Sequence, residues 1–165
     1  VRTKGLRDAI RAIAALPRDI DVHLDVAGQG EELSLCQAEA RRLGVAEHVT
    51  FHGQVTREQV EELYRQADAF LFPSFREPSG SVIFEAMRNG LPVITTDFGI
   101  NGLNLEEGAG FIRENSVCEF TRHMQQLQER GNNEALSARA IDTFQRFYSK
   151  EAIHSEYDEL FSMQE

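Results

Sequence analysis

Two glutamates separated by seven residues are the side chains of this chain best placed to do chemistry. Glu77 lies in a polar stretch, and Glu85 follows about a turn and a half into a helical pattern. Between them, the segment Ser79 to Val82 would begin that helix, where backbone N–H groups lack partners within the helix and the dipole is positive. Such a helix end suits a phosphate. The two carboxylates would flank it and could accept hydrogen bonds from sugar hydroxyls.

The elements around these glutamates form a βαβ unit over residues 70–96, FLFPSFREPSGSVIFEAMRNGLPVITT. Ala69–Phe72 is an apolar run of strand length, and Pro73 ends its pairing because proline has no N–H to donate. A helical pattern runs from Gly80 to a closing glycine, Gly90. Val93–Thr95 is a second run, rich in β-branched residues. The two strands should be parallel neighbours with the loop at their carboxyl edge.

The rest of the chain alternates helix and strand up to residue 112. Helices are expected over Leu6–Leu16, Leu33–Leu43, Thr56–Ala67, Cys118–Arg130, Asn133–Phe147 and Ser149–Met163, and strands over Asp21–Ala27, Val49–Phe51 and Gly110–Ile112. Thr56 with Gln59 three residues later predicts a capping box, and Ile153 is expected to face inward. The alternation predicts an α/β fold, a Rossmann-like doubly wound and mostly parallel sheet with helices on both faces.

The composition narrows the class of protein. The chain has 165 residues, enough for one domain with a sizeable core. Its net charge of −10 argues against nucleic acid or an anionic membrane as the main partner. No apolar run approaches the ~20 residues of a membrane span and no signal peptide opens the chain, so we expect a cytoplasmic domain. Cys36 and Cys118 lack metal-ligand spacing and are expected to be idle thiols in a reducing compartment.

The stretch EPSGSVIFEAMRNGLPVI resembles a family signature, E-[PG]-F-G-x-x-x-x-E-A-M-A-x-G-x-P-V-I, of retaining glycosyltransferases with the GT-B fold. Four further stretches, RTKGL, VAGQGEE, VTFHGQV and FYSKEAIHSEYDELF, resemble other parts of that family's C-terminal half. Ser79 stands where the family commonly has Phe, and Asp97 to Gly108 lacks a clear Gly-Gly and following Glu. The resemblance implies that residues 1–165 are the C-terminal, donor-binding domain. It also implies that the first strand and the N-terminal acceptor domain lie outside this chain, which begins at Val1 without a methionine.

The resemblance implies a pyrophosphate site. Lys4, from the Lys-Gly pair, would face the pyrophosphate and assist catalysis as charge develops on the leaving phosphate. The backbone amides of Ser79, Gly80, Ser81 and Val82 at the helix end would bind the same group. The family generally uses no metal for this step, and we expect none here.

The resemblance also assigns the groups on either side of the diphosphate. Glu85 would accept both ribose hydroxyls, which the two oxygens of a carboxylate can do together. Glu77 would hold a hydroxyl of the donor sugar and is a catalytic candidate, less so as a covalent nucleophile than as a binding group. Val55 would touch the nucleobase, mostly through its backbone.

The implied activity is the retaining transfer of a hexose from a nucleotide diphospho-sugar, with UDP favoured over GDP or ADP and no separate cofactor. The acceptor would be a glycan or a lipid-linked sugar, as in bacterial polysaccharide biosynthesis. The other partner would be the protein's own N-terminal domain, through which the whole enzyme could associate peripherally with a membrane. We expect this domain alone to transfer no sugar.

Other functions stay open. An inactive module of the same fold could serve binding or assembly. The presence of Lys4, Glu77 and Glu85 together disfavours this alternative, but the irregular residues Asp97 to Gly108 keep it open. A dinucleotide-dependent enzyme would need G-x-G-x-x-G, but Gly28-Gln29-Gly30 is followed by Leu33 where the third glycine belongs. A receiver-like signalling domain would need acidic residues clustered at strand ends, and none is evident.

Overall fold

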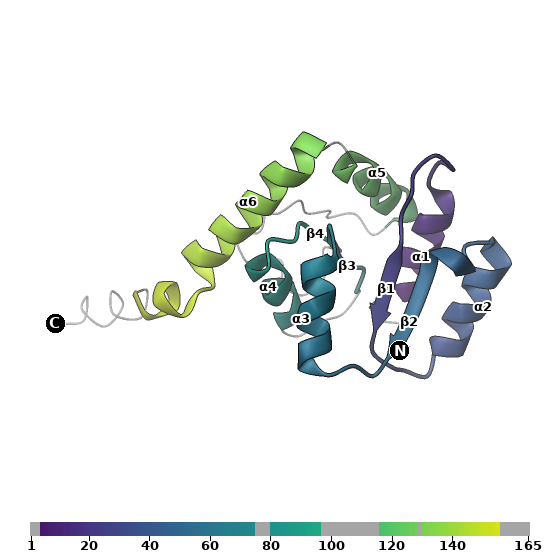
Figure 1. Cartoon of the computed structure of the whole chain (residues 1–165), viewed down its shortest axis with the longest axis horizontal. Coiled ribbons are helices and arrows are strands. Elements are labelled where there is room, and N and C mark those ends of the chain that lie inside the picture. The colour runs from purple at the N-terminus through teal and green to yellow at the C-terminus, as the bar shows by residue number, and fades with distance from the viewer. Residues whose placement is uncertain (1–3, 75–79, 97–115, 129, 156–165) are drawn as a thin grey trace.

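The computed structural model describes residues 4–74, 80–96, 116–128 and 130–155 of the chain (Figure 1). The elements in chain order are α1 (Leu6–Ala15), β1 (Leu24–Ala27), α2 (Leu33–Leu43), η2 (Ala46–His48), β2 (Val49–Gly53), α3 (Arg57–Gln66), β3 (Phe70–Phe72), α4 (Ser81–Arg88), β4 (Val93–Thr95), α5 (Val117–Leu127) and α6 (Arg130–Phe147). Residues 150–155 are also helical. None of the helices in the described ranges is both long enough and apolar enough to cross a bilayer.

The strands form two separate parallel pairs. β1 pairs with β2, with Leu24 opposite Val49, and β3 pairs with β4, with Phe70 opposite Val93. The two pairs are not hydrogen-bonded to each other. The predicted α/β class with parallel strands is therefore confirmed, but its strands make two sheets among the described residues where a single sheet was expected.

The elements of the β3–α4–β4 unit begin and end near the predicted proline and glycines. β3 ends at Phe72, directly before Pro73. Gly80 adopts a left-handed conformation with φ 52° as the N-cap of α4, and Gly90, with φ 75°, turns the chain after the helix. Only glycine enters this region of φ without a steric cost. β4 is buried at all three positions, as expected for an inner strand.

Helices cover both faces of the β3–β4 pair. Phe70, Phe72 and Val93 pack with residues of α3, α4 and α6. Leu71 and Ile94, which alternate with them, pack with residues of α1 and α5. Because neighbouring residues of a strand point to opposite faces, α1 and α5 lie on one face and α3, α4 and α6 on the other. The predicted two-sided arrangement is confirmed.

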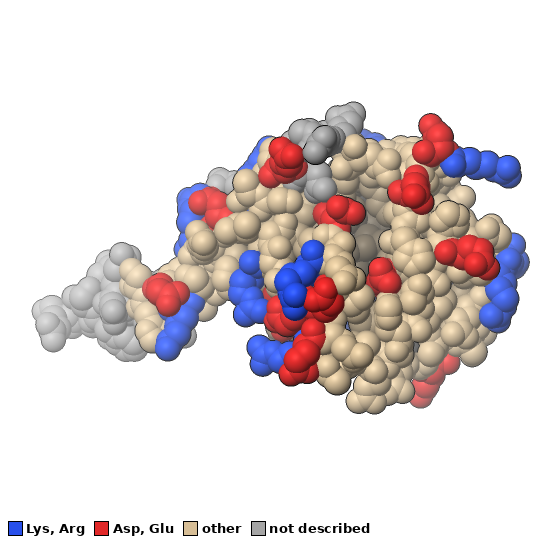
Figure 2. All heavy atoms as spheres, viewed as in Figure 1, with Lys and Arg blue, Asp and Glu red and all other residues tan. Residues whose placement is uncertain are grey.

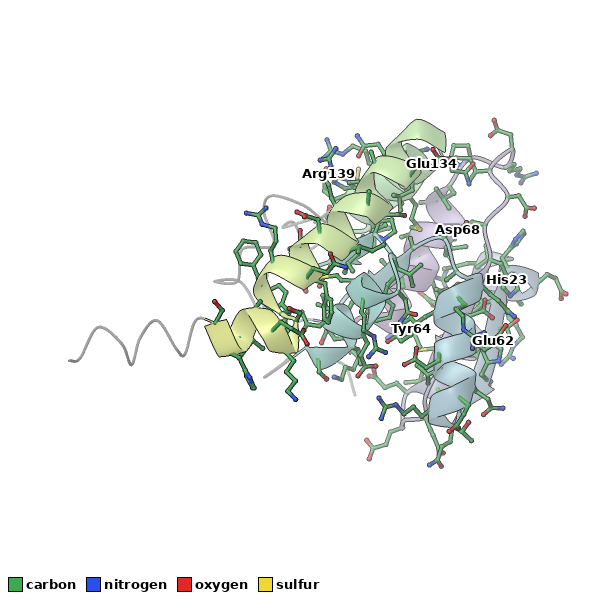
Figure 3. The ribbon with its side chains drawn as sticks, turned by 60° about the vertical axis from the view of Figure 1, so that its left-hand side comes forward. His23, Glu62, Tyr64, Asp68, Glu134 and Arg139 are labelled. Atoms are coloured by element: carbon green, nitrogen blue, oxygen red, sulfur yellow. The ribbon has the colours of Figure 1, made fainter. Side chains whose placement is uncertain are left out.

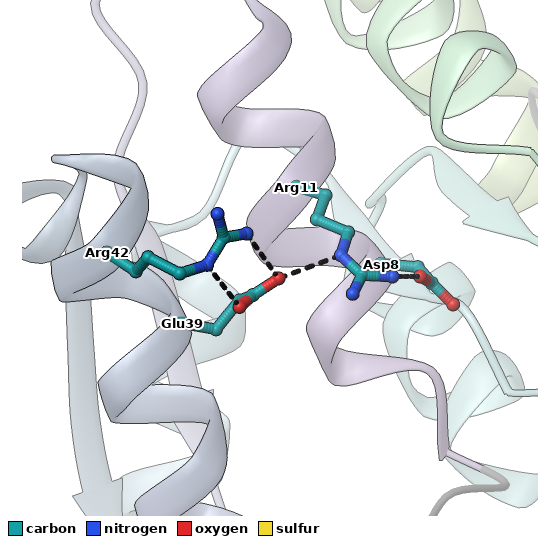
Figure 4. A network of polar contacts seen from close by, with 4 residues as sticks. All are labelled: Asp8, Arg11, Glu39 and Arg42. Carbon is teal, nitrogen blue, oxygen red and sulfur yellow. Dashed lines mark hydrogen bonds and ion pairs between the residues drawn. The ribbon is translucent and has the colours of Figure 1, made fainter.

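A buried carboxylate joins α1 to α2 (Figure 4). Glu39, on α2, is 7% exposed and accepts hydrogen bonds from Arg42 at 3.0 Å and from Arg11 of α1 at 2.9 Å. Arg11 also donates to Asp8 at 3.0 Å. The hydrogen bonds from Arg42 and then Arg11 lower the pKa of Glu39 to about 2. This network fixes the orientation of α1 against α2.

The ends of α2 and α3 follow the sequence signals. The Thr56 hydroxyl accepts from the Gln59 N–H at 3.3 Å, and the Gln59 side chain accepts from the Thr56 N–H at 2.8 Å. The predicted capping box is thus confirmed. α2 ends at Gly44, which has φ 74°. These two boundaries fix where the chain leaves α2 and enters α3.

Several expected boundaries and contacts were wrong. β1 begins at Leu24, three residues later than expected, and α6 begins at Arg130, three residues earlier. Ile153 is 40% exposed and does not face inward, because its helical segment extends past the body of the molecule beyond the end of α6 (Figure 1). The predicted strand Gly110–Ile112 lies outside the described residues.

Candidate functional site

The amino end of α4 begins at a glycine and has no side-chain cap among the described residues. Its N-cap, Gly80, is buried and its carbonyl accepts the Ile83 N–H at 2.8 Å. No side chain in the described part of the chain caps this helix. Ser81, the first helical residue, is exposed, and Val82 is half-buried. Among the described residues the first amide donors of α4 thus have no side-chain acceptor, and the helix dipole favours negative charge at this end.

The start of α1 is packed against the carboxyl end of β3. Gly5 is buried with φ 65°, and a Cβ at this position would lie 1.9 Å from the Pro73 carbonyl oxygen. The neighbouring Lys4 is exposed, and its Nζ lies 5.9 Å from the centroid of the Phe72 ring, within cation–π range. The fold thus brings Lys4 to the point where the chain leaves β3 toward α4.

Glu85 lies in the second turn of α4 and is half-buried. Burial first, and then the negative charge of Glu85, raises the pKa of Tyr64 to about 12. Tyr64 belongs to α3 (Figure 3), and its hydroxyl donates to the Val82 carbonyl at 3.4 Å. Glu85 is therefore close to the α3–α4 contact and a little more than one turn from the amino end of α4.

Two predicted site residues, Glu77 and Ser79, lie outside the described residues. Their roles stay predictions, as does the arrangement of Glu77 and Glu85 on either side of a diphosphate. Of the other parts of the predicted phosphate site, Lys4 lies beside Phe72 at the end of β3, and the start of α4 at Gly80 follows that strand in the chain.

The loops that follow β1 and β2 are joined to each other. The Gly28 N–H donates to the Gly53 carbonyl at 2.7 Å, and the Gln29 amide donates to the Gln54 side chain at 2.5 Å. Val55, the predicted nucleobase contact, follows directly and is half-buried. We had not predicted the glutamine pair, because a contact between residues 25 positions apart leaves no local pattern in the sequence.

Two buried threonines fix the chain beyond β3. The Thr95 hydroxyl donates to the Phe72 carbonyl at 2.9 Å, and the Thr96 hydroxyl donates to the Ser74 carbonyl. Thr95 is 6% exposed and Thr96 is 3% exposed. The sequence pattern predicted Thr95 only as a β-branched residue of a strand. Their hydroxyls instead hold the carboxyl end of β3, from which the loop to α4 departs.

His23 and His52 are engaged with neighbouring side chains on the β1–β2 pair. His23 hydrogen-bonds Thr50 at 2.7 Å, and His52 hydrogen-bonds Asp25 at 2.6 Å, both on the exposed face of the β1–β2 pair. Within the described ranges no group of three or more His, Cys, Asp or Glu residues could hold a metal ion. Figure 2 shows acidic and basic side chains interspersed on the visible face, without a broad basic patch of the kind that binds nucleic acid.

Residues 1–142 match the family model described as glycosyl transferases group 1. The lipopolysaccharide core biosynthesis glycosyltransferase LpsE of Rhizobium meliloti is 30% identical over 172 residues, covering 98% of this chain and 47% of the relative. The lipopolysaccharide glucosyltransferase WaaG of Escherichia coli is 39% identical over 95 residues, covering 56% of this chain and 25% of the relative. This chain therefore spans half or less of the length of these relatives.

Among solved structures, that of HepE from Anabaena in complex with UDP and glucose has the same fold. It superposes with a TM-score of 0.81 over 99% of this chain and 46% of its own length, at 21% sequence identity. At this identity the likeness concerns the fold. The topology of the described elements is thus that of one half of a GT-B protein.

Proposed function

Because this chain belongs to the glycosyl transferases group 1 family, we propose that it is the nucleotide-diphospho-sugar-binding half of a retaining glycosyltransferase. The observation that carries the proposal is the amino end of α4 at Gly80, which no side chain of the described residues caps. This helix follows β3 in the chain, and Lys4 lies at the carboxyl end of that strand. In open α/β sheets, ligands bind outside the carboxyl ends of the strands. The α4 end and Lys4 offer dipole and charge to a diphosphate at that edge.

The chemistry assigned to this site is stabilisation of the leaving group. When the bond from the anomeric carbon to the diphosphate breaks, negative charge grows on the phosphate oxygen while the sugar becomes oxocarbenium-like. Fixed donors aimed at that oxygen stabilise the transition state more than the ground state. In the proposal, the Nζ of Lys4 and the amides of residues 79–82 serve as these donors, and the step involves no metal.

The remaining contacts of the proposed site concern hydroxyls and the base. Glu85 accepts hydrogen bonds from the two ribose hydroxyls, and its position a little more than one turn from the amino end of α4 supports this role. Glu77 accepts from a hydroxyl of the transferred hexose. Val55 contacts the base at the joined loops after β1 and β2. These loops follow β1 and β2, and the start of α4 follows β3, so each of these groups lies beyond the carboxyl end of a strand.

The proposed donor is a UDP-hexose, and the acceptor a glycan or lipid-linked sugar held by a second domain. The complex of HepE with UDP and glucose supports the choice of base, and the lipopolysaccharide relatives support the acceptor class. In a thermal-shift panel of UDP, GDP and ADP we expect UDP to raise the midpoint most, because a ligand that binds only the folded state stabilises it in proportion to RT ln(1 + [L]/Kd).

Isothermal titration calorimetry with UDP tests the proposed site. We expect the chain to bind UDP, and Lys4→Ala and Glu85→Gln each to weaken binding by about tenfold or more, since a hydrogen bond to a charged group contributes ~1.5–3 kcal/mol. The matched controls are Lys150→Ala and Glu151→Gln, both exposed in the helical segment beyond α6. The proposal is wrong if the chain does not bind UDP, or if the site variants bind it as tightly as the controls.

A further inference from the structure

We propose that Thr95 and Thr96, at the end of β4, are positioning residues for the diphosphate site: their hydroxyls hold the end of β3, and through it they hold Lys4. This role rests on the proposed function, and it adds two buried residues that the proposed phosphate contacts do not include. Neither threonine needs to touch the nucleotide. Both act on the segment against which α1 begins.

The main-chain pairing of β3 stops just before that segment. β3 ends at Phe72, which lies opposite Thr95 of β4 in the parallel register (Figure 1). The next residue, Pro73, has no N–H and cannot donate to a neighbouring strand. The ladder between β3 and β4 therefore does not fix the path of the chain beyond Phe72, and another attachment is needed there.

The two threonines provide this attachment on both sides of Pro73. The Thr95 hydroxyl donates to the carbonyl of Phe72, the residue before the proline, at 2.9 Å. The Thr96 hydroxyl donates to the carbonyl of Ser74, the residue after it. Thr95, Thr96 and Ser74 are all buried, and burial removes the water that could replace a lost hydrogen bond. The position of Pro73 is thus fixed through both of its neighbours.

The start of α1 rests on Pro73. Gly5 packs so closely against the Pro73 carbonyl oxygen that a Cβ at residue 5 would lie 1.9 Å from it. The Gly5 carbonyl in turn accepts the N–H groups of Asp8 at 2.9 Å and of Ala9 at 3.1 Å, which ties this glycine to the first turn of α1. A displacement of Pro73 would therefore move the start of α1, because close-packed contacts transmit strain.

Lys4 is held by the same segment. It directly precedes Gly5, and its Nζ lies 5.9 Å from the centroid of the Phe72 ring, within the range of a cation–π interaction. The Phe72 ring is itself packed, with its centroid 5.8 Å from that of Phe70. The threonines thus reach the lysine by two routes, one through the contact of Pro73 with Gly5 and one through Phe72.

Positioning of this kind matters for a lysine. Its ammonium group is a point charge on a flexible four-carbon stem, and fixing such a stem on binding costs rotamer entropy. A lysine whose position is already restricted loses less on binding. The threonine hydroxyls should therefore strengthen the binding of the phosphates and leave the binding of the nucleoside unchanged. A role in overall stability alone would weaken both ligands by the same factor, because only the folded fraction would change.

The experiment compares UDP with uridine, which lacks the phosphates, in NMR-detected titrations of the parent chain and its variants. Thr95→Val and Thr96→Val keep the shape of the side chain and remove the donor. We expect each to weaken UDP binding by about fivefold or more, part of the effect of a hydrogen bond to a charged group, and to change uridine binding by less than about twofold. Thr95→Ser and Thr96→Ser, which restore the hydroxyl, should bind UDP as the parent does. An unchanged ratio of UDP to uridine affinity in both valine variants would overturn the positioning role.

Thr121→Val is the matched control. Thr121 is buried on α5, and its hydroxyl lies within hydrogen-bond distance of the carbonyls of Ala12 on α1, at 3.2 Å, and of Val117, at 2.8 Å. It is therefore also a buried hydroxyl bound to the backbone of α1, but in the second half of that helix. The ratio of UDP to uridine affinity should stay at the parent value. A change as large as in the site variants would show a general effect of lost stability and would overturn the positioning role.

A combination with Lys4→Ala separates this role from the proposed function. If the threonines act through Lys4, their valine substitutions should change UDP affinity by less than about twofold in the Lys4→Ala background, because coupled residues are not additive. A parent chain that binds UDP, with equal losses in the presence and absence of Lys4, would contradict the positioning role and leave the proposed function intact. A parent chain that does not bind UDP would overturn both.

A measurement on the parent chain covers the case in which a valine variant does not fold. Linkage is reciprocal, so if the hydroxyl bonds strengthen UDP binding, UDP must strengthen the hydroxyl bonds by the same factor. Saturating UDP should therefore slow the exchange of the Thr95 and Thr96 hydroxyl protons with water by about fivefold more than that of Thr121, which reports the stabilisation of the whole fold. Equal slowing of all three hydroxyl protons would overturn the positioning role.

Discussion

Replacing Gly5 by alanine should destabilise the fold far more than an ordinary glycine-to-alanine change. Gly5 has φ 65°, and the added Cβ would lie 1.9 Å from the Pro73 carbonyl oxygen, a backbone atom at the end of β3. The left-handed conformation costs a non-glycine residue ~1–2 kcal/mol. Relieving the overlap adds ~1–3 kcal/mol, as for an overpacked core. We therefore expect Gly5→Ala to lower the free energy of unfolding by about 2–5 kcal/mol.

Gly44 provides the matched control. It also has a positive φ, 74°, at the end of α2, but a Cβ there would meet nothing within 4 Å. Gly44→Ala should therefore cost only the conformational part, ~1–2 kcal/mol. Urea denaturation followed by circular dichroism measures both variants against the parent chain, whose stability of ~5–15 kcal/mol for a typical domain leaves room for the larger loss.

The difference between the two variants isolates the contact of Gly5 with Pro73. We expect Gly5→Ala to lose about 1–3 kcal/mol more than Gly44→Ala. The scatter of such comparisons is ~0.5 kcal/mol. If the two losses in unfolding free energy agree within that value, the start of α1 does not abut β3. The placement of Lys4 beside the phosphate site then loses its support.

Two further substitutions test the local structure. Thr56→Ala removes the hydroxyl that caps α3 and should lower the free energy of unfolding by ~1 kcal/mol, with Thr56→Ser retaining most of the stability; an alanine variant as stable as the parent would contradict the capping box. Glu39→Gln should be destabilising at pH 7. The pKa of Glu39 is about 2, below its ordinary 4.5, so its stabilising effect is present above about pH 4.5 and is lost as the pH falls toward 2. The difference in unfolding free energy between parent and variant should shrink over that window, and a difference that stays constant would show that the Arg11 and Arg42 contacts do not depend on the charge.

The β3–α4–β4 unit could be predicted from the sequence because its boundaries are marked by residues with strong local preferences. Pro73 ends one strand, and glycines at Gly80 and Gly90 bracket the helix. The capping box at Thr56 is also a local signal. In each case the physical cause, a missing donor, a left-handed backbone or a reciprocal side-chain bond, lies within a few residues of the boundary.

The lateral order of the strands could not be predicted in the same way. Nothing local to Phe70–Phe72 shows that β3 and β1 belong to separate pairs among the described residues, because pairing between strands joins residues that are far apart in the chain. The same holds for the bond between Gln29 and Gln54. The exposure of Ile153 also depends on which element lies beside it, and its helical spacing alone could not exclude an inward position.

In the candidate site, too, features with a local cause could be predicted from the sequence, and features that depend on long-range contacts could not. The amino end of α4 at Gly80 followed from spacing, since a glycine before an apolar helical pattern predicts a helix start. The resemblance of the Lys-Gly pair predicted only that Lys4 faces the pyrophosphate. Its nearness to Phe72, and the close approach of Gly5 to Pro73 that accompanies it, appear only in three dimensions.

The central claim is that one end of α4 and the start of α1 together bind the diphosphate of a nucleotide. The most direct test follows the backbone amide resonances of the ¹⁵N-labelled chain during a titration with UDP. We predict the largest shifts at residues 80–82 and at Lys4 and Gly5, with smaller ones near Val55. Saturating shifts confined to other parts of the chain, or no shifts with UDP, would contradict the account.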